Sequence, residues 1–242
     1  MLLYLIRHGE PDYQTDTLTE TGWLQARKLA KRLAVSGLDE IHASPMGRAQ
    51  QTAQPTAELL NLPIITEPWA KELGEETYTT YPDGVPKAIS RLMPEYYHQK
   101  KFVDMNTETA FAKIPGLCDS GFHARYKSIA DGLDAMLAKT GYVRNDNGFY
   151  DVVKPDDRHI ALFCHAAMMR VLLSHLMHIP VQLLSSSAML HFTGITILYF
   201  DPSKFRKDQT TELCPGLISY GDVGHLFAEG EENIHFWTGK TF

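Results

Sequence analysis

The chain has 242 residues, of which 44% are hydrophobic and 21% are charged. This composition is typical of a globular protein with a substantial core, and it excludes a chain that is disordered throughout. There are 23 Lys and Arg residues against 29 Asp and Glu, giving a formal net charge of −6 without a long basic run, so we expect no general binding to nucleic acid or to an anionic membrane.

The cysteines and the start of the chain predict a cytoplasmic protein. Cys118, Cys164 and Cys214 are far apart and form no CxxC pair, which favours a reducing compartment over a disulfide framework. The apolar opening has no basic segment in front of it and meets Arg7 after six residues, which is too short for a signal peptide or a membrane span.

Strands and helices are expected to alternate over the first part of the chain. Residues 2–6 form an unbroken apolar run, typical of a strand that is buried on both faces. Thr19 or Thr21 can cap a following helix, and Gly37 can end it. A later helix has Pro45 at an early position, where the missing N–H costs little. The expected order is a strand at 2–6, a helix between 19 and 37, a strand at 39–43, a helix from 44 to about 60 and a short strand at 63–65.

Residues 74–121 differ in character from the rest of the chain. They hold four prolines and many aromatic residues, with no long helical or strand period. We expect an inserted cap segment with one or two short helices. The alternation then resumes, with a helix at 122–139, a turn at 145–148, a strand at 159–164, a helix at 166–178 and a β-rich segment at 192–200.

This alternation predicts a single α/β domain over residues 1–242. We expect a three-layer, doubly wound and mostly parallel sheet with helices on both faces and the cap segment inserted. Ligands bind such sheets beyond the carboxyl ends of the strands. Four side chains follow predicted strands and are therefore expected to meet at one edge of the sheet. They are Arg7, His8, Arg48 and His165.

Arginine and histidine in one place favour phosphoryl transfer. A guanidinium group is a planar, permanently charged fork that matches phosphate oxygens. A neutral imidazole is a competent nucleophile near pH 7, and its attack on phosphorus would give a phosphohistidine that water then hydrolyses. Because arginine cannot supply the proton that a leaving alkoxide needs, a carboxylic acid should stand nearby.

The sequence RHGE at residues 7–10, directly after the first strand, resembles the motif of the histidine phosphatase (phosphoglycerate mutase-like) superfamily. Three further segments resemble motifs of this family and occur in its order. They are residues 18–26 (LTETGWLQA), 44–53 (SPMGRAQQTA) and 163–165 (FCH), the last followed by Arg170. The resemblance covers about residues 1–75 and 119–200.

The resemblance implies a role for each of the four side chains. His8 is expected to be the phosphorylated nucleophile. Arg7, Arg48 and His165 are expected to bind the phosphoryl group, where they would stabilise the charge of its transition state.

The resemblance also nominates a general acid, which in this family usually lies in an L-x-E segment after the third strand. Glu72, in the sequence AKELG, is the nearest counterpart, and Glu75 and Glu76 are the alternatives. Gln14 stands where many relatives carry a phosphate-contacting Asn, and Ala166 stands where they usually have glycine. Further contacts to phosphate or substrate are therefore expected from Gly9, Gln14 and Ala166.

By the same resemblance we expect a metal-independent phosphomonoesterase that acts on a small phosphorylated metabolite, with no cofactor. The expected partner is this small molecule rather than nucleic acid or a membrane, and a homodimer stays open. Two alternatives use the same fold: a phosphoglycerate-type mutase, and a non-catalytic module that binds a phospho-ligand or a protein. The chain lacks the ERHYG-type acid segment of the mutase branch, which favours the phosphatase.

Cys164 and Arg170 also satisfy C-x5-R, the spacing found in cysteine phosphatases. The phosphate loop of such an enzyme needs several inward N–H groups, which glycine normally makes possible. The residues after His165 are AAMM, a helix-forming run without glycine. Cys164 is therefore expected to be a buried strand residue.

Overall fold

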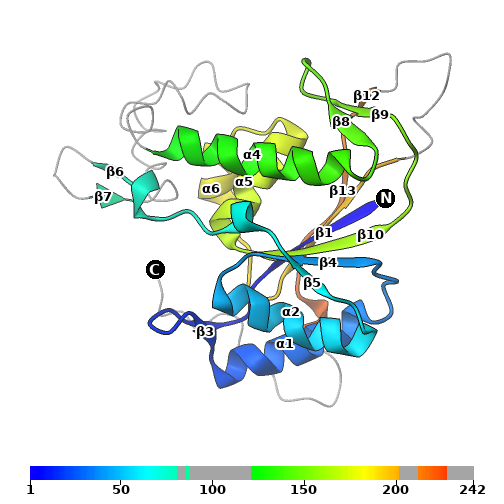
Figure 1. The fold of residues 1–242 in the computed structure, drawn as a ribbon. Helices are drawn as coiled ribbons and strands as arrows, with labels where there is room; N and C mark the ends of the chain where they lie inside the picture. Colours follow the sequence, from blue (N-terminus) through cyan, green and yellow to red (C-terminus); the bar gives the residue numbers. More distant parts are fainter. Residues whose placement is uncertain (81–85, 88–120, 202–211, 228–242) are drawn as a thin grey trace.

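The computed structural model describes residues 1–80, 86–87, 121–201 and 212–227, and these build a central six-stranded sheet (Figure 1). Its strands are β1 (Leu2–Arg7), β4 (Glu40–Ala43), β5 (Ile64–Thr66), β10 (His159–Cys164), β11 (Ile195–Tyr199) and β13 (Gly216–Asp222). Their order is β13-β11-β1-β10-β4-β5. The strands β1, β10, β4 and β5 pair in parallel, whereas β11 is antiparallel to both of its neighbours. The predicted mostly parallel sheet is therefore confirmed.

Helices cover both faces of this sheet (Figure 1). One face carries α1 (Glu20–Leu33) and α2 (Gly47–Leu60), and the other carries α4 (Phe122–Ala138), α5 (Ala166–Met177) and α6 (Val181–Ser187). The apolar run of β1 serves both layers, because its successive side chains point to opposite faces. Leu3 and Leu5 pack with α4 and α5, while Tyr4 and Ile6 pack with α1 and α2. The three-layer α/β fold is thus confirmed.

The helix boundaries differ in part from the prediction. Thr19 caps α1, since its Oγ1 accepts the Gly22 N–H at 3.0 Å. The helix ends before Gly37, which takes a φ of +65° in the turn that follows. The second helix begins at Gly47, later than predicted, because the Ser44 N–H still donates to a carbonyl of β10 at 2.9 Å. The chain therefore leaves β4 in an extended form that keeps Ser44 near the ends of the strands.

Short elements that the sequence did not predict surround the main sheet. Strands of two or three residues carry too few side chains to show an alternating pattern. The predicted turn at 145–148 lies between two of these short strands, residues 142–144 and 150–152. The elements are β2 (Pro11–Asp12) with β3 (Thr17–Leu18), β6 (Thr79–Thr80) with β7 (Pro86–Lys87), β8 (Tyr142–Arg144) with β9 (Tyr150–Val152) and β12 (Glu212–Leu213), and the 3₁₀ helices η1 (Pro68–Ala70), η2 (Glu75–Thr77) and η5 (Gly224–Phe227).

The predicted cap segment at 74–121 lies mostly outside the described residues, as do the one or two short helices expected in it. Its described start consists of η2 and the β6–β7 pair. In the described parts of the chain, every helix is too short or too polar to cross a membrane. The cytoplasmic location stays a prediction.

Candidate active site

The ends of three parallel strands bring the predicted side chains together. Arg7 ends β1 and pairs in register with Cys164, the last residue of the neighbouring β10, so His8 and His165 follow side by side. Their ring centroids lie 5.2 Å apart, with the planes tilted by 55°. Arg48 enters from the first turn of α2, directly after β4. The topology therefore places residues that are up to 158 positions apart on one edge of the sheet.

His8 is buried and holds one defined tautomer. Its Nδ1 lies 2.7 Å from the carbonyl oxygen of Gly9, and because a carbonyl only accepts, Nδ1 must carry the proton. Burial, followed by the charges of Arg7 and Arg48, lowers the pKa of His8 to about 3. The ring is therefore neutral near pH 7, and the lone pair on its Nε2 is free to attack an electrophile.

His165 is fully buried, and its Nε2 lies 2.8 Å from Ser44 Oγ. Ser44 Oγ accepts the Met46 N–H at 3.3 Å and can donate its own proton to Nε2, which leaves the ring proton of His165 on Nδ1. This Nδ1 is buried and has no hydrogen-bond partner among the described residues. Burial, His8 and the Arg48 charge lower the pKa of His165 to about 2, so this ring is also neutral.

Both arginines are fixed by contacts on their outer sides. The Arg7 guanidinium lies 4.0 Å from the centroid of the Phe192 ring and donates to a backbone carbonyl of the same loop. Arg48 pairs with Asp16, whose other carboxylate oxygen accepts the Gly47 N–H at 2.7 Å. The Nε atoms of both arginines are buried and, in the described structure, have no hydrogen-bond partner. Buried N–H donors without partners are costly, and an anion between these side chains would satisfy them.

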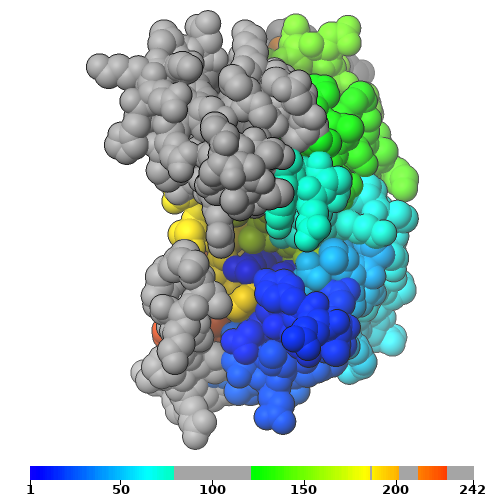
Figure 2. All heavy atoms as spheres, turned by 90° about the vertical axis from the view of Figure 1, so that its left-hand side faces the viewer, coloured from blue at the N-terminus to red at the C-terminus, as the bar shows by residue number. Residues whose placement is uncertain are grey.

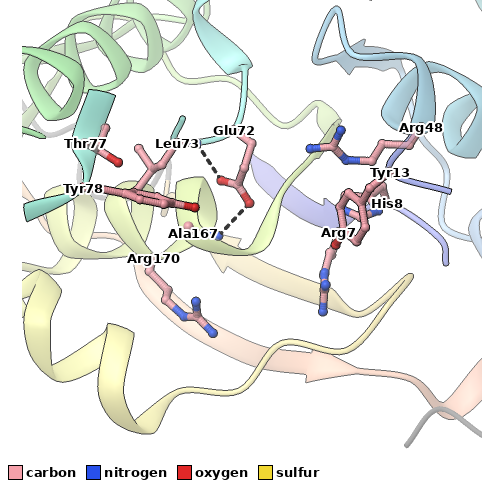
Figure 3. Close-up of a pocket in the computed structure, with 10 residues that line it drawn as sticks. All are labelled: Arg7, His8, Tyr13, Arg48, Glu72, Leu73, Thr77, Tyr78, Ala167 and Arg170. Atoms are coloured by element: carbon pink, nitrogen blue, oxygen red, sulfur yellow. Dashed lines mark hydrogen bonds between the residues drawn. The ribbon is translucent and has the colours of Figure 1, made fainter. Parts of the chain in front are cut away.

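Glu72 approaches the same place from the segment after β5. Its Oε1 accepts the N–H groups of Leu73 at 3.0 Å and Met168 at 2.9 Å, and its Oε2 accepts the Ala167 N–H at 3.2 Å. Ala167 and Met168 belong to the first turn of α5, whose unpaired N–H groups and dipole attract a carboxylate. Glu72 is thereby held at the N-terminus of α5, facing Arg7 and Arg48 (Figure 3).

Arg7, His8, Arg48 and Glu72 line one cavity of about 340 Å³, within the size range of small-molecule sites. His165 is fully buried beside His8 and is not among the lining residues. Figure 2 shows this face of the molecule hollowed where the dark blue start of the chain meets the cyan residues above it. The cavity is lined by Arg7, His8, Tyr13, Arg48, Glu72, Leu73, Thr77, Tyr78, Ala167 and Arg170 (Figure 3). Of the three candidate acids, Glu72 alone lines it, whereas Glu75 and Glu76 are exposed in η2.

Besides His165, three further predicted contact residues do not line this cavity. Gly9 donates its N–H to Thr52 Oγ1 at 2.9 Å, so that amide is not available to a phosphate. A Cβ at Gly9 would lie 2.8 Å from the Gly22 carbonyl oxygen, so glycine is required here by packing. Gln14 is exposed in the β2–β3 hairpin, and Ala166 faces the core beneath α5. The cavity lining does not include these three positions, and their contact with phosphate or substrate stays a prediction.

The sequence did not predict several of the lining residues. Tyr13 stands next to the nominated Gln14, and the Arg48 guanidinium lies 5.5 Å from the centroid of its ring. Thr77 and Tyr78 lie near the start of the predicted cap segment, and the position of this segment after the candidate acid was the available signal. Arg170 was noted for its spacing and received no role. Whether each of these four residues lines the cavity depends on the direction of its side chain, which the sequence does not reveal.

Cys164 is a buried strand residue, as predicted. It ends β10 with its side chain in the core, and burial raises the pKa of its thiol far above the ordinary value. It is therefore unsuited to act as a thiolate nucleophile. Among the residues that the structure describes, no group of three or more His, Cys, Asp or Glu side chains has an arrangement suited to a metal ion.

Comparisons with known proteins identify the family of this chain. The family model of the histidine phosphatase superfamily (branch 1) matches residues 3–212. The probable phosphoglycerate mutase GpmB of Yersinia pestis (strain Pestoides F) is 34% identical over 122 residues, which cover 47% of this chain and 53% of that protein. The chain thus spans about half the length of the curated relatives it matches.

Solved structures share the fold at low identity. A phosphoserine phosphatase from Entamoeba histolytica, solved with phosphoserine, has a TM-score of 0.60 at 22% identity and covers 93% of this chain and 98% of its own. A mycobacterial glucosyl-3-phosphoglycerate phosphatase has a TM-score of 0.58 at 19% identity, covering 91% and 98%. With the family match over most of the chain and the sheet and strand-end site described above, the protein belongs to branch 1 of the histidine phosphatase superfamily.

Proposed function

We propose that the protein is a metal-independent phosphomonoesterase that acts on a small phosphorylated metabolite through a phosphohistidine on His8. The observation that carries this proposal is a neutral His8 with its Nε2 lone pair free, beside buried N–H donors that have no partner in the described structure. Those donors are Arg7 Nε, Arg48 Nε and His165 Nδ1. A nucleophile beside N–H groups without hydrogen-bond partners suits an electrophile with negatively charged oxygens. A phosphoryl group is such an electrophile.

In the first step, Arg7, Arg48 and His165 bind the non-bridging oxygens of the phosphoryl group. The lone pair of His8 Nε2 attacks phosphorus, a P–N bond forms and the P–O bond to the ester oxygen breaks. The guanidinium groups are already fixed by Phe192 and Asp16, so they stabilise the transition-state charge without having to reorganise.

Glu72 acts as the general acid in this step. Its proton passes to the leaving ester oxygen, which departs as an alcohol. In the second step Glu72 accepts a proton from a water molecule, whose oxygen attacks the phosphohistidine. The P–N bond breaks, inorganic phosphate leaves and His8 returns to its starting tautomer.

The names of the solved relatives support the phosphatase reading, since both are phosphatases of phosphorylated carboxylic acids or their derivatives. A mutase is the second candidate, because the curated relatives are named probable phosphoglycerate mutases. In a mutase, the phosphohistidine would return its phosphoryl group to a hydroxyl of the sugar acid instead of to water. Incubation with 2- and 3-phosphoglycerate, followed by phosphorus NMR, separates the two. Isomerisation faster than phosphate release would overturn the phosphatase proposal.

Hydrolysis of p-nitrophenyl phosphate by matched variants tests the assignment of the nucleophile. We expect His8→Gln to abolish turnover, because the amide is no nucleophile, and Cys164→Ser to retain it. Both side chains are buried, so thermal unfolding serves as the control for folding. Loss of activity in Cys164→Ser with activity retained in His8→Gln would contradict the proposal.

A further inference from the structure

A third guanidinium lines the cavity and takes no part in the mechanism above. Arg170 projects from α5, and its Nε donates to the Ala188 carbonyl oxygen at 3.1 Å. Its two terminal nitrogens have no hydrogen-bond partner among the described residues. Figure 3 shows this guanidinium on the side of the cavity away from Arg48, with the Tyr78 hydroxyl also directed into the cavity. The hydrogen bond at Nε thus fixes the Arg170 side chain, while its two terminal nitrogens stay available to bind a ligand.

The charges around Arg170 favour the binding of an anion. Burial is the main cause that lowers the pKa of Arg7. The charge of the nearby Arg170 lowers it further, because the two cations repel each other. Burial lowers the pKa of Arg170, against the opposing effects of Tyr220 and then of Glu72, the carboxylate among its neighbours. In the reactive form, Glu72 carries the proton that it will donate and no longer offsets Arg170. A partly buried cation then faces the substrate without a negative neighbour in the described part of the cavity.

We propose that Arg170 binds a carboxylate of the substrate, so that the substrate is a small phosphorylated carboxylic acid. This inference rests on the proposed function, in which Arg7, Arg48 and His165 hold the phosphoryl group on the other side of the cavity. Two terminal nitrogens in a plane match a carboxylate as a bidentate pair. A second phosphate, which carries about two negative charges near pH 7, would call for more than this one guanidinium. The cavity of about 340 Å³ limits the acid to a small metabolite.

Two matched pairs of esters test the proposal on the unmodified protein. O-phosphoserine and O-phosphoethanolamine differ by a carboxylate, and 3-phosphoglycerate and glycerol 3-phosphate differ by the change of a carboxylate to a hydroxymethyl group. We expect kcat/KM to be roughly 10- to 100-fold higher for the acid in at least one pair, the range for a charge-assisted hydrogen-bonded contact. Equal values within both pairs would overturn the proposal, whatever the behaviour of any variant.

Variants then assign the preference to Arg170. In Arg170→Met we expect the acid-to-alcohol ratio of kcat/KM to fall to about one, and in Arg170→Lys, which keeps the charge but not the fork, to recover in part. Arg27→Met is the matched control, since Arg27 is an exposed arginine of α1 and its loss should leave the ratio unchanged. If Arg170 only counterbalanced Glu72 or held Ala188, its loss would lower both members of a pair equally and keep the ratio. That result would overturn the proposal.

Failure of this inference and failure of the proposed function are distinguishable. A protein that hydrolyses p-nitrophenyl phosphate and glycerol 3-phosphate through His8, with no preference for acids, refutes the carboxylate site alone. A protein that hydrolyses none of these esters refutes the phosphatase itself. A measured wild-type preference that persists in Arg170→Met would place the carboxylate on another residue.

Discussion

Replacing Glu72 by Gln separates its two contributions, proton donation and the anchoring of α5. The amide cannot donate the proton that a leaving alkoxide needs, and general acid catalysis contributes roughly 10²- to 10⁴-fold. We therefore expect kcat/KM for an alkyl phosphate such as glycerol 3-phosphate to fall by about that factor. A nitrophenolate leaves without a proton, so kcat/KM for p-nitrophenyl phosphate should fall by less than about tenfold in the same variant.

The structural cost of Glu72→Gln follows from its hydrogen bonds. The carbonyl oxygen of the amide can keep the Leu73 and Met168 N–H groups, now accepted at 3.0 and 2.9 Å, while the NH₂ group faces the Ala167 N–H. Loss of this one bond should lower the free energy of unfolding by about 1 kcal/mol, which thermal or urea unfolding can measure. Glu76→Gln, an exposed glutamate four residues on, is the matched control for both assays.

Steady-state kinetics on the two substrates decide between the roles. An equal loss for the alkyl and the nitrophenyl ester would mean that Glu72 acts by holding the geometry at α5, and the acid role would be refuted. A selective loss for the alkyl ester in Glu76→Gln, with Glu72→Gln active, would move the acid to η2.

Three further outcomes are expected. Because the folded-state pKa of His8 is about 3, below the ordinary value of 6.5, the unfolded chain binds its proton first as the pH falls, and the free energy of unfolding should drop below pH 6.5. Urea unfolding at pH 7 and pH 5 should show a drop that is smaller by about 1–2 kcal/mol in His8→Gln, and an equal drop would contradict the shift. Asp16→Asn releases Arg48 and should lower kcat/KM roughly 10- to 100-fold in steady-state assays; an unchanged value would mean that Asp16 does not position Arg48 for catalysis. Gly9→Ala brings a Cβ to 2.8 Å from a backbone oxygen and should cost about 1–3 kcal/mol in thermal unfolding, whereas Gly216→Ala, with nothing within 4 Å, should leave Tm nearly unchanged.

The central strands of the main sheet could be predicted because a strand buried on both faces needs an unbroken run of apolar residues. The strand at 159–164 has the predicted bounds, and the run at 2–6 is extended by one residue. The second sheet was missed, since its strands have two or three residues and their pairing joins distant segments such as 150–152 and 212–213. The edge strand β13 was also missed, because its exposed start shows no buried alternation.

In the candidate site too, some residues could be predicted from the sequence and others could not. Strand-end residues such as His8 and His165 could be predicted to meet, because topology alone brings the ends of parallel strands together. Glu72 could not be separated from its neighbours by sequence, since its contact with the first turn of α5 spans 95 and 96 positions. Tyr13 was passed over for Gln14, because which of two adjacent hairpin residues faces the cavity depends on the turn, not on residue type.

Trapping the covalent intermediate tests the central claim most directly. The protein is mixed with a labelled phosphomonoester, quenched within a single turnover and digested, and the phosphorylated peptide is identified by mass spectrometry. We expect an acid-labile, base-stable phosphate on the peptide that holds His8, forming at least as fast as kcat and absent from His8→Gln. Turnover without any protein-bound phosphate, or an acid-stable adduct on another residue, would contradict it.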